Sequence, residues 1–381
     1  MTPGARASAA IEILDRILAG DPAERALTNW GRASRYAGSG DRAAVRDLVF
    51  DALRQRRSAA ARGGGLTGRG LVLGLMRAAG QEALFSGEGH APPPPAPDET
   101  GRPPDPDEAL DLPDWLIPDL RASLGPDLRP VAEALRHRAP VFLRVNRLKA
   151  DLPAAQAALA AEGIETRPHP LSPTALEVTA NPRKLQASAA YREGLVELQD
   201  ASSQAVVDAL PLADGMRVLD HCAGGGGKTL AMAGRARLRL FAHDATPRRM
   251  ADLPERARRA GAAVTLTDRP EAEAPYDLIL ADAPCSGSGS WRRDPEGKWN
   301  LTPEGLDRTV EIQRDILDRL APMVREGGIL AYATCSLLDR ENSGQARAFL
   351  ARHPEYAEER ALTLTPMQGG DGFFLAIFRR R

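Results

Sequence analysis

A chain of 381 residues with 43% hydrophobic and 27% charged residues has the composition of a folded globular protein, and its length indicates two or three domains. A net charge of −1 argues against non-specific coating of nucleic acid but permits a local basic groove. Without a membrane-length apolar run, a secretion signal, a disulfide framework or zinc-ligand spacing, we expect a monomeric cytoplasmic protein that binds neither membrane nor metal.

Residues 1–85 are predicted to form a helical domain. Apolar residues recur at helical spacing from Ala10 to Leu18 and again from Val45 to Leu53, after Ser39-Gly40-Asp41. The same region is rich in arginine: Arg32, Arg35, Arg42, Arg46, Arg54, Arg56, Arg57, Arg62 and Arg69. A solvated face of a helical bundle and a module that docks on RNA explain this surplus equally well.

Two further segments precede the main domain. Residues 86–108 contain a run of four prolines from Pro92 to Pro95 and few apolar residues, so we expect a linker. Residues 109–195 are predicted to form a small α+β subdomain. Its expected helices are near Trp115–Leu124, Val131–Arg138 and Leu152–Glu162, and its expected strands are Val141–Val145, Ile164–Arg167 and Ala175–Val178.

Residues 196–381 alternate between strand and helix patterns, which is typical of a doubly wound, Rossmann-like α/β sheet. Helices are expected over Pro247–Ala260 and Thr302–Leu320, and a last pair of strands around Phe373–Phe378 is expected to close the sheet edge. The central strands are predicted at Arg217–Asp220, Leu240–Asp244, Val264–Asp268, Leu278–Asp282 and Ile329–Thr334.

Four predicted strands end in an aspartate, and the first runs into a glycine-rich loop. A single strand-end aspartate is usually a helix cap, but four in series outline a ligand site beyond the carboxyl ends of the strands. Glycines let the backbone approach a ligand closely. The aspartates are Asp220, Asp244, Asp268 and Asp282, and the loop is Cys222, Ala223, Gly224, Gly225, Gly226, Gly227 and Lys228, followed by Thr229.

The loop alone leaves two ligands open. A nicotinamide-binding G-x-G-x-x-G motif fails, because it requires glycine where Thr229 stands. A phosphate-binding loop fits Gly227-Lys228-Thr229 but requires glycine at Cys222. S-adenosylmethionine is the third interpretation, in which Asp244 holds the ribose hydroxyls.

Two of the three cysteines follow predicted strands. Cys285 lies in Asp282-Ala283-Pro284-Cys285-Ser286-Gly287, and Cys335 lies in Thr334-Cys335-Ser336. Isolated cysteines are mostly buried packing residues, but two at strand ends favour chemistry. A thiolate that adds to cytosine C6 makes C5 able to attack a sulfonium methyl group, after which a base removes the C5 proton and the thiol leaves. Phosphate transfer has no use for this pair.

These motifs resemble the Sun/Nop family of RNA cytosine-C5 methyltransferases over nearly the whole chain. The catalytic motifs are highly specific together, whereas the helical region, similar to a NusB-like domain, is a weaker match. The segments that carry the resemblance are Ser39-Gly40-Asp41-Arg42, Leu112-Pro113-Asp114-Trp115, Arg138–Asn146, Glu197-Leu198-Gln199-Asp200, the glycine loop, Asp282–Gly287, Arg292-Arg293-Asp294-Pro295 with Lys298-Trp299, and Thr334-Cys335-Ser336.

The resemblance implies a role for each matching residue. Cys335 would be the nucleophile, and Cys285 would assist release of the methylated base. Cys222–Lys228 with Asp244, Asp268 and Asp282 would bind S-adenosylmethionine, and Lys228 and Asp282 would also contact the cytosine ring. His221 is expected to be a core histidine with its hydrogen bonds satisfied, and Cys222 to be a packing residue.

The resemblance also implies RNA as the partner, with ribosomal RNA favoured and transfer RNA open. Arg292, Arg293, Lys298 and Trp299 are expected to contact RNA, although a solvated loop would also carry such residues. The base must leave its stack to reach Cys335. Two other functions stay open at this point, a nucleotide hydrolase and a non-catalytic ribosome-assembly protein.

The glycine loop departs from the family pattern and generates a prediction. The family usually has Ala or Ser followed by Pro where this chain has Gly224 and Gly225. Each such change costs about 0.4–1 kcal/mol of loop order, because glycine has more conformations to lose. We therefore expect Gly225→Pro to bind S-adenosylmethionine more tightly in calorimetry, and an unchanged affinity would contradict this.

Overall fold

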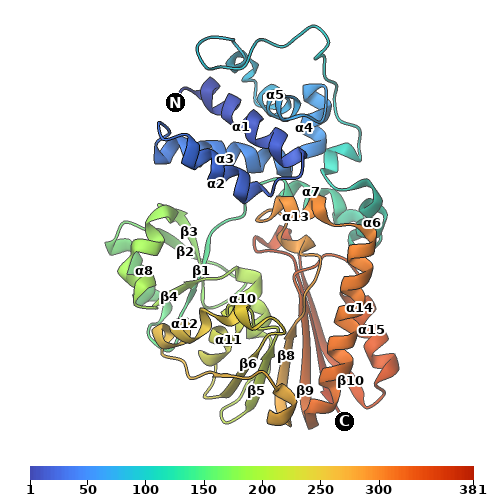
Figure 1. Ribbon diagram of the computed structural model, residues 1–381. Helices are drawn as coiled ribbons and strands as arrows, with labels where there is room; N and C mark the ends of the chain where they lie inside the picture. The colour runs from blue at the N-terminus through green and yellow to red at the C-terminus, as the bar shows by residue number, and fades with distance from the viewer. The chain divides into compact units, whose positions relative to one another are not determined.

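The computed structural model describes all 381 residues and divides into two compact units (Figure 1). The helical unit comprises Met1–Arg121, Gly125–Arg138 and Trp291–Asn300. The sheet unit comprises Ala122–Leu124, Ala139–Ser290 and Leu301–Arg381. None of the helices combines the length and the apolar character that crossing a membrane requires.

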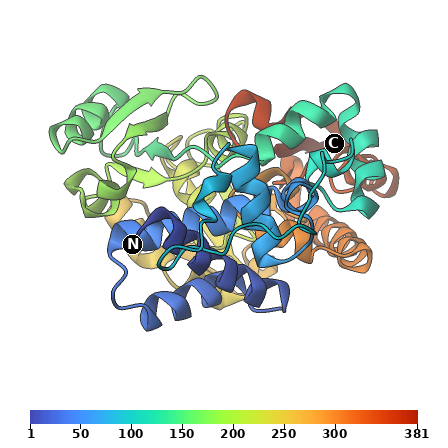
Figure 2. The same cartoon turned by 90° about the horizontal axis from the view of Figure 1, so that it is seen from above.

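The helical unit is built on amphipathic helices whose apolar faces share one core (Figures 1 and 2). Ile13 and Leu14 of the first helix, Val45 and Val49 of the third, and Leu71 of the fifth are fully buried in it. Helical spacing predicted the positions in the first and third helices but not Leu71. The helices of this core are α1 (Pro3–Leu18), α2 (Ala23–Ala33), α3 (Ser39–Arg54), α4 (Arg56–Gly63) and α5 (Gly68–Ala78). The unit also contains α6 (Ile117–Leu124) as far as Arg121, α7 (Leu128–Leu135) and α13 (Pro295–Asn300).

The proline-rich segment contains no helix or strand between Phe85 and Asp107, yet polar contacts hold it against the helices. The guanidinium of Arg69 forms an ion pair with Glu99 at 2.6 Å and donates to the carbonyl of Pro93. The hydroxyl of Ser8 donates to the carbonyl of His90 at 2.8 Å. Side chains of the helices thus satisfy carbonyls of a segment that has few apolar residues to bury.

The segment Trp291–Asn300 is distant in sequence from the rest of the helical unit but belongs to it. The ammonium of Lys298 donates to the carbonyl of Arg54 at 3.0 Å, and the indole N–H of Trp299 donates to the carbonyl of Leu53 at 2.7 Å. Because α3 ends at Arg54, these carbonyls are among those that the helix cannot pair internally. The segment therefore closes the last turn of α3.

A four-stranded antiparallel sheet opens the sheet unit, in the order β2-β3-β1-β4. Leu143 of the central strand and Leu159 of the covering helix are fully buried in its core. Its elements are β1 (Phe142–Val145), α8 (Leu152–Ala161), β2 (Glu165–Pro168), β3 (Ala175–Ala180), α9 (Ala189–Arg192) and β4 (Val196–Leu198).

The second sheet has seven strands in the order β10-β11-β9-β8-β5-β6-β7. Strands β5 to β9 are parallel and β11 runs antiparallel to β9, so the predicted Rossmann-like α/β fold is confirmed. The strands are β5 (Arg217–His221), β6 (Arg239–His243), β7 (Thr265–Leu266), β8 (Tyr276–Asp282), β9 (Val324–Thr334), β10 (Tyr356–Leu364) and β11 (Phe373–Arg380).

Helices cover both faces of this sheet (Figure 1). Along β8, Leu278 and Leu280 pack in one cluster with α10 (Ala201–Asp208) and α11 (Gly227–Ala233). Ile279 and Ala281 pack in another with α14 (Pro303–Leu320) and α15 (Ser343–Arg352). Alternate side chains of one strand thus enter two cores, as a sheet buried on both faces requires.

Two sequence predictions for this sheet need correction. The strand expected at Val264–Asp268 is reduced to Thr265–Leu266, whose exposed side chains have no core to hold a longer strand. The helix expected at Pro247–Ala260 is a 3-10 turn at Pro247–Met250 followed by α12 (Leu253–Ala260), with Pro254 at the start of α12. The expected last pair of strands closes the sheet edge: β11 (Phe373–Arg380) pairs with β9, and β10 lies outside β11 at the edge.

Candidate active site

The register of the parallel strands brings their carboxyl ends to one edge of the sheet. His221 of β5 stands opposite His243 of β6 and Ala281 of β8, and Asp282 stands opposite Ala333 of β9. The loops that follow these strands carry the glycines, Asp244 and the two cysteines. The strand order reverses between β5 and β8, where ligands bind in folds of this type.

The glycine loop turns sharply against the end of β6. Cys222, Gly224 and Gly226 have φ angles of 68°, 51° and 79°, a region that only glycine enters without strain. A Cβ at Gly226 would lie 2.2 Å from Leu253 Cδ1, so only glycine fits there. The buried carboxyl group of Asp244 accepts hydrogen bonds from the amide of Gly224 at 3.0 Å and of Thr246 at 2.9 Å.

Gly225 differs from its neighbours. Its φ lies outside the left-handed region, and an added Cβ would meet only the flexible guanidinium of Arg256, at 2.9 Å. The position therefore tolerates a side chain better than Gly224 or Gly226 does. The effect of Gly225→Pro on cofactor affinity stays a prediction.

Arginines of the small sheet and of α12 hold the carbonyls of this loop. The guanidinium of Arg144 on β1 donates to the carbonyl of Gly227 at 2.6 Å, and that of Arg256 donates to the carbonyl of Gly225. Burial lowers the pKa of Arg144 to about 10. The buried Glu197 on β4 in turn pairs with Arg256 at 2.9 Å and with Arg259. The two sheets are thereby joined at the loop, a support that no sequence pattern indicated.

Behind the loop, the end of β5 is polar and buried. Asp220 accepts a hydrogen bond from the hydroxyl of Thr229 at 2.5 Å, while its Oδ1 has no partner. The rings of His221 and His243 stack at 4.8 Å, and burial lowers the pKa of His221 to about 3. His221 is a core residue as expected, but the expectation that its hydrogen bonds are satisfied was wrong. Its Nδ1 has no partner, since the neighbouring His243 ring stacks on the face of the His221 ring and not on its edge, where the nitrogen atoms bond.

Lys228 lies between the glycine loop and the cysteines. Its ammonium group pairs with Asp282 at 2.7 Å and lies 4.9 Å from the centre of the Phe373 ring. Burial lowers the pKa of Lys228, but the charge of Asp282 and its hydrogen bond outweigh burial, so the pKa is raised overall. The pair supplies one hydrogen-bond donor and one acceptor beside the cysteines.

The sulfur atoms of Cys285 and Cys335 lie 3.3 Å apart, at the ends of β8 and β9. The amide of Gly289 donates to the carbonyl of Cys335 at 2.9 Å, which ties the two loops together. A hydrogen bond from the Cys285 thiol lowers the pKa of Cys335, and the same contact raises the pKa of Cys285 well above its usual range. Cys335 is therefore the thiol that ionises first, as a nucleophile requires.

The structure separates the other predicted site residues into three groups. Burial raises the pKa of Cys222 to about 12, which leaves it a protonated thiol at the base of the loop. Asp268 is exposed on the loop after β7. Arg292, Arg293, Lys298 and Trp299 belong to the helical unit, where Arg292 and Lys298 are buried and Arg293 is exposed.

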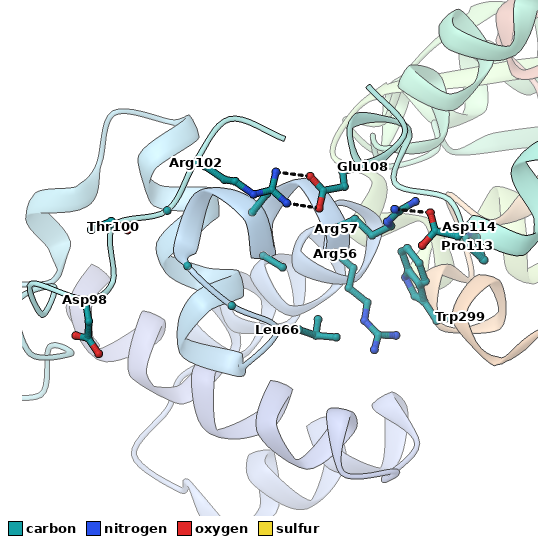
Figure 3. Close-up of a pocket in the computed structure, with 15 residues that line it drawn as sticks. Arg56, Arg57, Leu66, Asp98, Thr100, Arg102, Glu108, Pro113, Asp114 and Trp299 are labelled. Atoms are coloured by element: carbon teal, nitrogen blue, oxygen red, sulfur yellow. Dashed lines mark hydrogen bonds and ion pairs between the residues drawn. The ribbon is translucent and has the colours of Figure 1, made fainter. Parts of the chain in front are cut away.

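Trp299 lines a cavity of about 680 Å³ within the helical unit (Figure 3). The guanidinium of Arg56 lies 5.1 Å from the centre of its ring. Two other arginines of the cavity have acidic partners, Arg57 with Asp114 and Arg102 with Glu108. Arg56 contacts the indole instead of a carboxylate.

This sheet order, with a glycine loop after the first parallel strand and acidic residues at the strand ends, defines a Rossmann-like methyltransferase domain of class I. Residues 207–379 match the family described as 16S rRNA methyltransferase RsmB/F. Residues 112–183 match the ferredoxin-like domain of RsmF/B-like methyltransferases. The chain belongs to the RsmB/F family of methyltransferases.

Individual relatives agree with this assignment. The ribosomal RNA small subunit methyltransferase B of Citrobacter koseri is 34% identical over 280 residues, which are 69% of this chain and 65% of that protein. The chain thus spans less than two thirds of this relative. PH0851 has the same fold over 100% of this chain and 99% of its own, with a TM-score of 0.77 and 23% identity. NSun6 from Pyrococcus horikoshii, solved with SFG, covers 70% of this chain and 98% of its own, with a TM-score of 0.64 and 18% identity.

The buried carboxyl group at the end of β5 generates a prediction for stability. Burial raises the pKa of Asp220 to about 7, whereas an unfolded aspartate titrates near about 4. The folded protein therefore binds this proton more tightly, and the stabilisation that results is fully present below about pH 4 and lost as the pH rises to about 7. Asp220→Asn cannot ionise. As the pH rises from about 4 to about 8, we expect its free energy of unfolding to increase by about 2–4 kcal/mol relative to that of the wild type.

Urea unfolding across this pH range measures the difference. Asp252→Asn, which changes an exposed aspartate before α12, serves as the control and should follow the wild type. A constant difference between Asp220→Asn and wild type at every pH would show that Asp220 is ionised throughout.

Proposed function

We propose that this protein transfers a methyl group from S-adenosylmethionine to C5 of a cytosine in RNA, and that this RNA is small-subunit ribosomal RNA. The observation that carries the proposal is the pair of sulfur atoms 3.3 Å apart at the ends of β8 and β9, beside the Lys228–Asp282 ion pair. Such a pair serves thiol addition to a base and its reversal.

The residues at the loop fit the proposed cofactor. S-adenosylmethionine carries hydrogen-bond donors, namely ribose hydroxyls and an ammonium group, and supplies an activated methyl group. The site is rich in acceptors, with buried carboxyl groups at Asp220 and Asp244 and an Oδ1 of Asp220 that has no partner. A phosphate-bearing ligand would meet these acidic groups, and Lys228 is already paired with Asp282. This donor and acceptor balance favours the cofactor over a nucleoside triphosphate.

The side chains of the chain divide the work of the reaction. The Cys335 thiolate adds to cytosine C6, and the electron pair of the C5–C6 bond moves toward the ring carbonyl and N3. Lys228 and Asp282 would stabilise the ring during this step. The ammonium group would attract the negative charge that develops on the ring, and the carboxyl group would form a hydrogen bond with the ring. Once C5 carries the methyl group, loss of the C5 proton expels Cys335, and Cys285 assists this release.

Ribosomal RNA as the substrate rests on the relatives. The family description and the curated relatives both name ribosomal RNA of the small subunit. The chain spans 65% of the Citrobacter koseri protein, so the assignment of this substrate to the present chain is a proposal. A cytosine in a loop or in partly unfolded RNA fits best, because the base must leave its stack to reach a thiol.

We further propose that the helical unit contacts RNA at the cavity lined by Arg56 and Trp299. A guanidinium without a carboxylate partner, beside an aromatic ring in a cavity of about 680 Å³, offers both a charge for phosphate and a surface for an unstacked base. Leu66, which is 51% exposed, adds an apolar wall (Figure 3). This location supports RNA contact by Trp299 in the helical unit.

The first experiment measures methyl transfer. Labelled S-adenosylmethionine is incubated with unmodified ribosomal RNA and with transfer RNA. We expect label in ribosomal RNA, a loss of at least about 10⁴-fold with Cys335→Ala because the covalent route disappears, and a protein–RNA adduct that accumulates with Cys285→Ala. Ser343→Ala, which changes the first residue of α15, should remain active.

Three outcomes would change the proposal. Label in transfer RNA alone would replace the substrate. Residual transfer by Cys335→Ala near the wild-type rate would remove Cys335 as nucleophile. Cofactor binding without transfer to free RNA or to assembly intermediates would leave a non-catalytic RNA-binding protein.

The second experiment tests the cavity of the helical unit. We expect Arg56→Gln to weaken binding of a single-stranded cytidine-rich oligonucleotide by about fivefold to tenfold, since one charge-assisted contact contributes about 1–1.4 kcal/mol. The slope of the logarithm of the binding constant against the logarithm of the salt concentration should become shallower by about one. Arg32→Gln removes an exposed arginine of α2 as the charge-matched control. Equal losses for both variants would mean that general charge binds RNA, and no loss for Arg56→Gln would remove the cavity from the interface.

A further inference from the structure

A buried glutamate connects the two cysteine loops of the sheet unit. Glu341 lies six residues after Cys335, and its side chain is 0% exposed. Its Oε1 accepts a hydrogen bond from the amide of Ser286 at 2.8 Å, and its Oε2 accepts from the hydroxyls of Ser286 and Ser336. The residues directly after both cysteines therefore bind the same carboxyl group.

A buried glutamine adds a second connection on the other side of Cys285. Nε2 of Gln313, on α14, donates to Oε1 of Glu341 at 3.0 Å and to the carbonyl of Pro284 at 2.9 Å. Gln313 is also fully buried. The residues before and after Cys285 are thus both fixed to one polar cluster, Glu341–Gln313. Such a cluster is rigid because each of its buried groups has a partner.

The turn that carries Glu341 is itself anchored to β9. The hydroxyl of Tyr332 donates to the carbonyl of Glu341 at 2.6 Å. Nδ2 of Asn342 donates to the carbonyl of Ser336 at 2.9 Å, and its Oδ1 accepts from the hydroxyl of Thr334 at 2.5 Å. These contacts fix the position of the turn and therefore hold the Glu341 carboxyl group between the two cysteine loops.

The charges around the two thiols are not symmetrical. The groups that act on them are Lys228 and Asp282 at Cys335, Tyr332 at Cys285, and Glu341. After the thiol contact and burial, the charges of Cys335 and Glu341 raise the pKa of Cys285 further. At Cys335, after the same two causes, the charges of Asp282 and Glu341 raise the pKa and the cation Lys228 lowers it. The hydrogen bond between the thiols is the largest cause of the pKa shift at both sulfur atoms, so the 3.3 Å contact that the loops maintain is what distinguishes them.

We propose that Glu341 is a positioning residue that sets the two cysteine loops against each other and assigns nucleophilic attack to Cys335. It acts through its hydrogen bonds with Ser286, Ser336 and Gln313, which hold the two loops and therefore the contact between the thiols in place. Its significance for catalysis rests on the proposed function, but its effect on the thiols does not. The proposal is therefore testable without RNA or cofactor.

The test is alkylation of the whole protein by iodoacetamide, in which a thiolate displaces iodide and forms a carbon–sulfur bond. Peptide mass spectrometry measures the initial rate at each cysteine. We expect Cys335 to react faster than Cys285 in the wild type. Glu341→Gln keeps the shape but replaces a carboxylate oxygen with an NH2 group, which cannot accept from the hydroxyls of Ser286 and Ser336 and so loosens the thiol contact. A change of one unit in the pKa difference between the thiols alters the ratio of rates by about tenfold. We expect the ratio of Cys335 to Cys285 to fall by about that factor.

Matched variants separate positioning from general damage. Glu341→Asp keeps the charge and should restore part of the ratio. Asp339→Asn removes an exposed charge from the same turn, where Asp339 pairs with Arg347 at 3.0 Å, and should leave the ratio unchanged. Ser336→Ala removes one hydroxyl contact without a change in charge and should give an intermediate ratio, even if Glu341→Gln fails to fold.

Two results would overturn the proposal: an unchanged ratio in folded Glu341→Gln, or an equal fall in Asp339→Asn. With active protein, Glu341→Gln should lower kcat for methyl transfer while KM for S-adenosylmethionine stays within about twofold, since the carboxyl group does not contact the cofactor loop. A changed alkylation ratio in a protein that methylates no RNA would reject the proposed function and keep the role of Glu341.

Discussion

The register between β8 and β9 is the constraint on which the candidate site depends. Asp282 stands opposite Ala333, so both strands end at the same level and their loops bring Cys285 within 3.3 Å of Cys335. A slip of one residue would exchange the faces of β8, placing Leu278 and Leu280 in the core that holds Ile279 and Ala281. The apolar packing of both faces thus maintains the distance between two sulfur atoms that lie outside it.

Acidic groups crowd the same edge, and the fold neutralises each in a different way. Asp220 accepts from a threonine hydroxyl, and Asp244 accepts from two backbone amides and pairs with Arg249 at 3.3 Å. Only Asp282 has a buried lysine as its partner. Because an unpaired buried charge is costly, these partners decide where the edge is neutral and where it holds a fixed ion pair. The fixed ion pair lies beside the cysteines, where charge would develop during thiol addition.

Sequence patterns predicted what depends on local order. The strands from Arg217 and Leu278 were found because apolar runs end in aspartate, and the two cysteines because each follows a predicted strand. The hydrogen bond from Arg144 to the carbonyl of Gly227 joins residues far apart in the chain, and no periodic pattern in the sequence indicates it. Glu341 was missed for the same reason, since a glutamate two residues after an exposed aspartate resembles any solvated turn. The strand at Val264–Asp268 was overestimated because burial, which decides strand length, is invisible in one sequence.

The segment Trp291–Asn300 has a consequence for how the protein is made. The helical unit takes Met1–Arg121 and Gly125–Arg138 from the start of the chain, but the carbonyls of Leu53 and Arg54 receive their partners from Trp299 and Lys298. During synthesis, more than 150 further residues must therefore be added before the carbonyls in the last turn of α3 meet their partners. Its expression as an isolated fragment would leave the carbonyl end of α3 open to water. A shortened version that keeps its native packing would have to carry residues 291–300 as a graft.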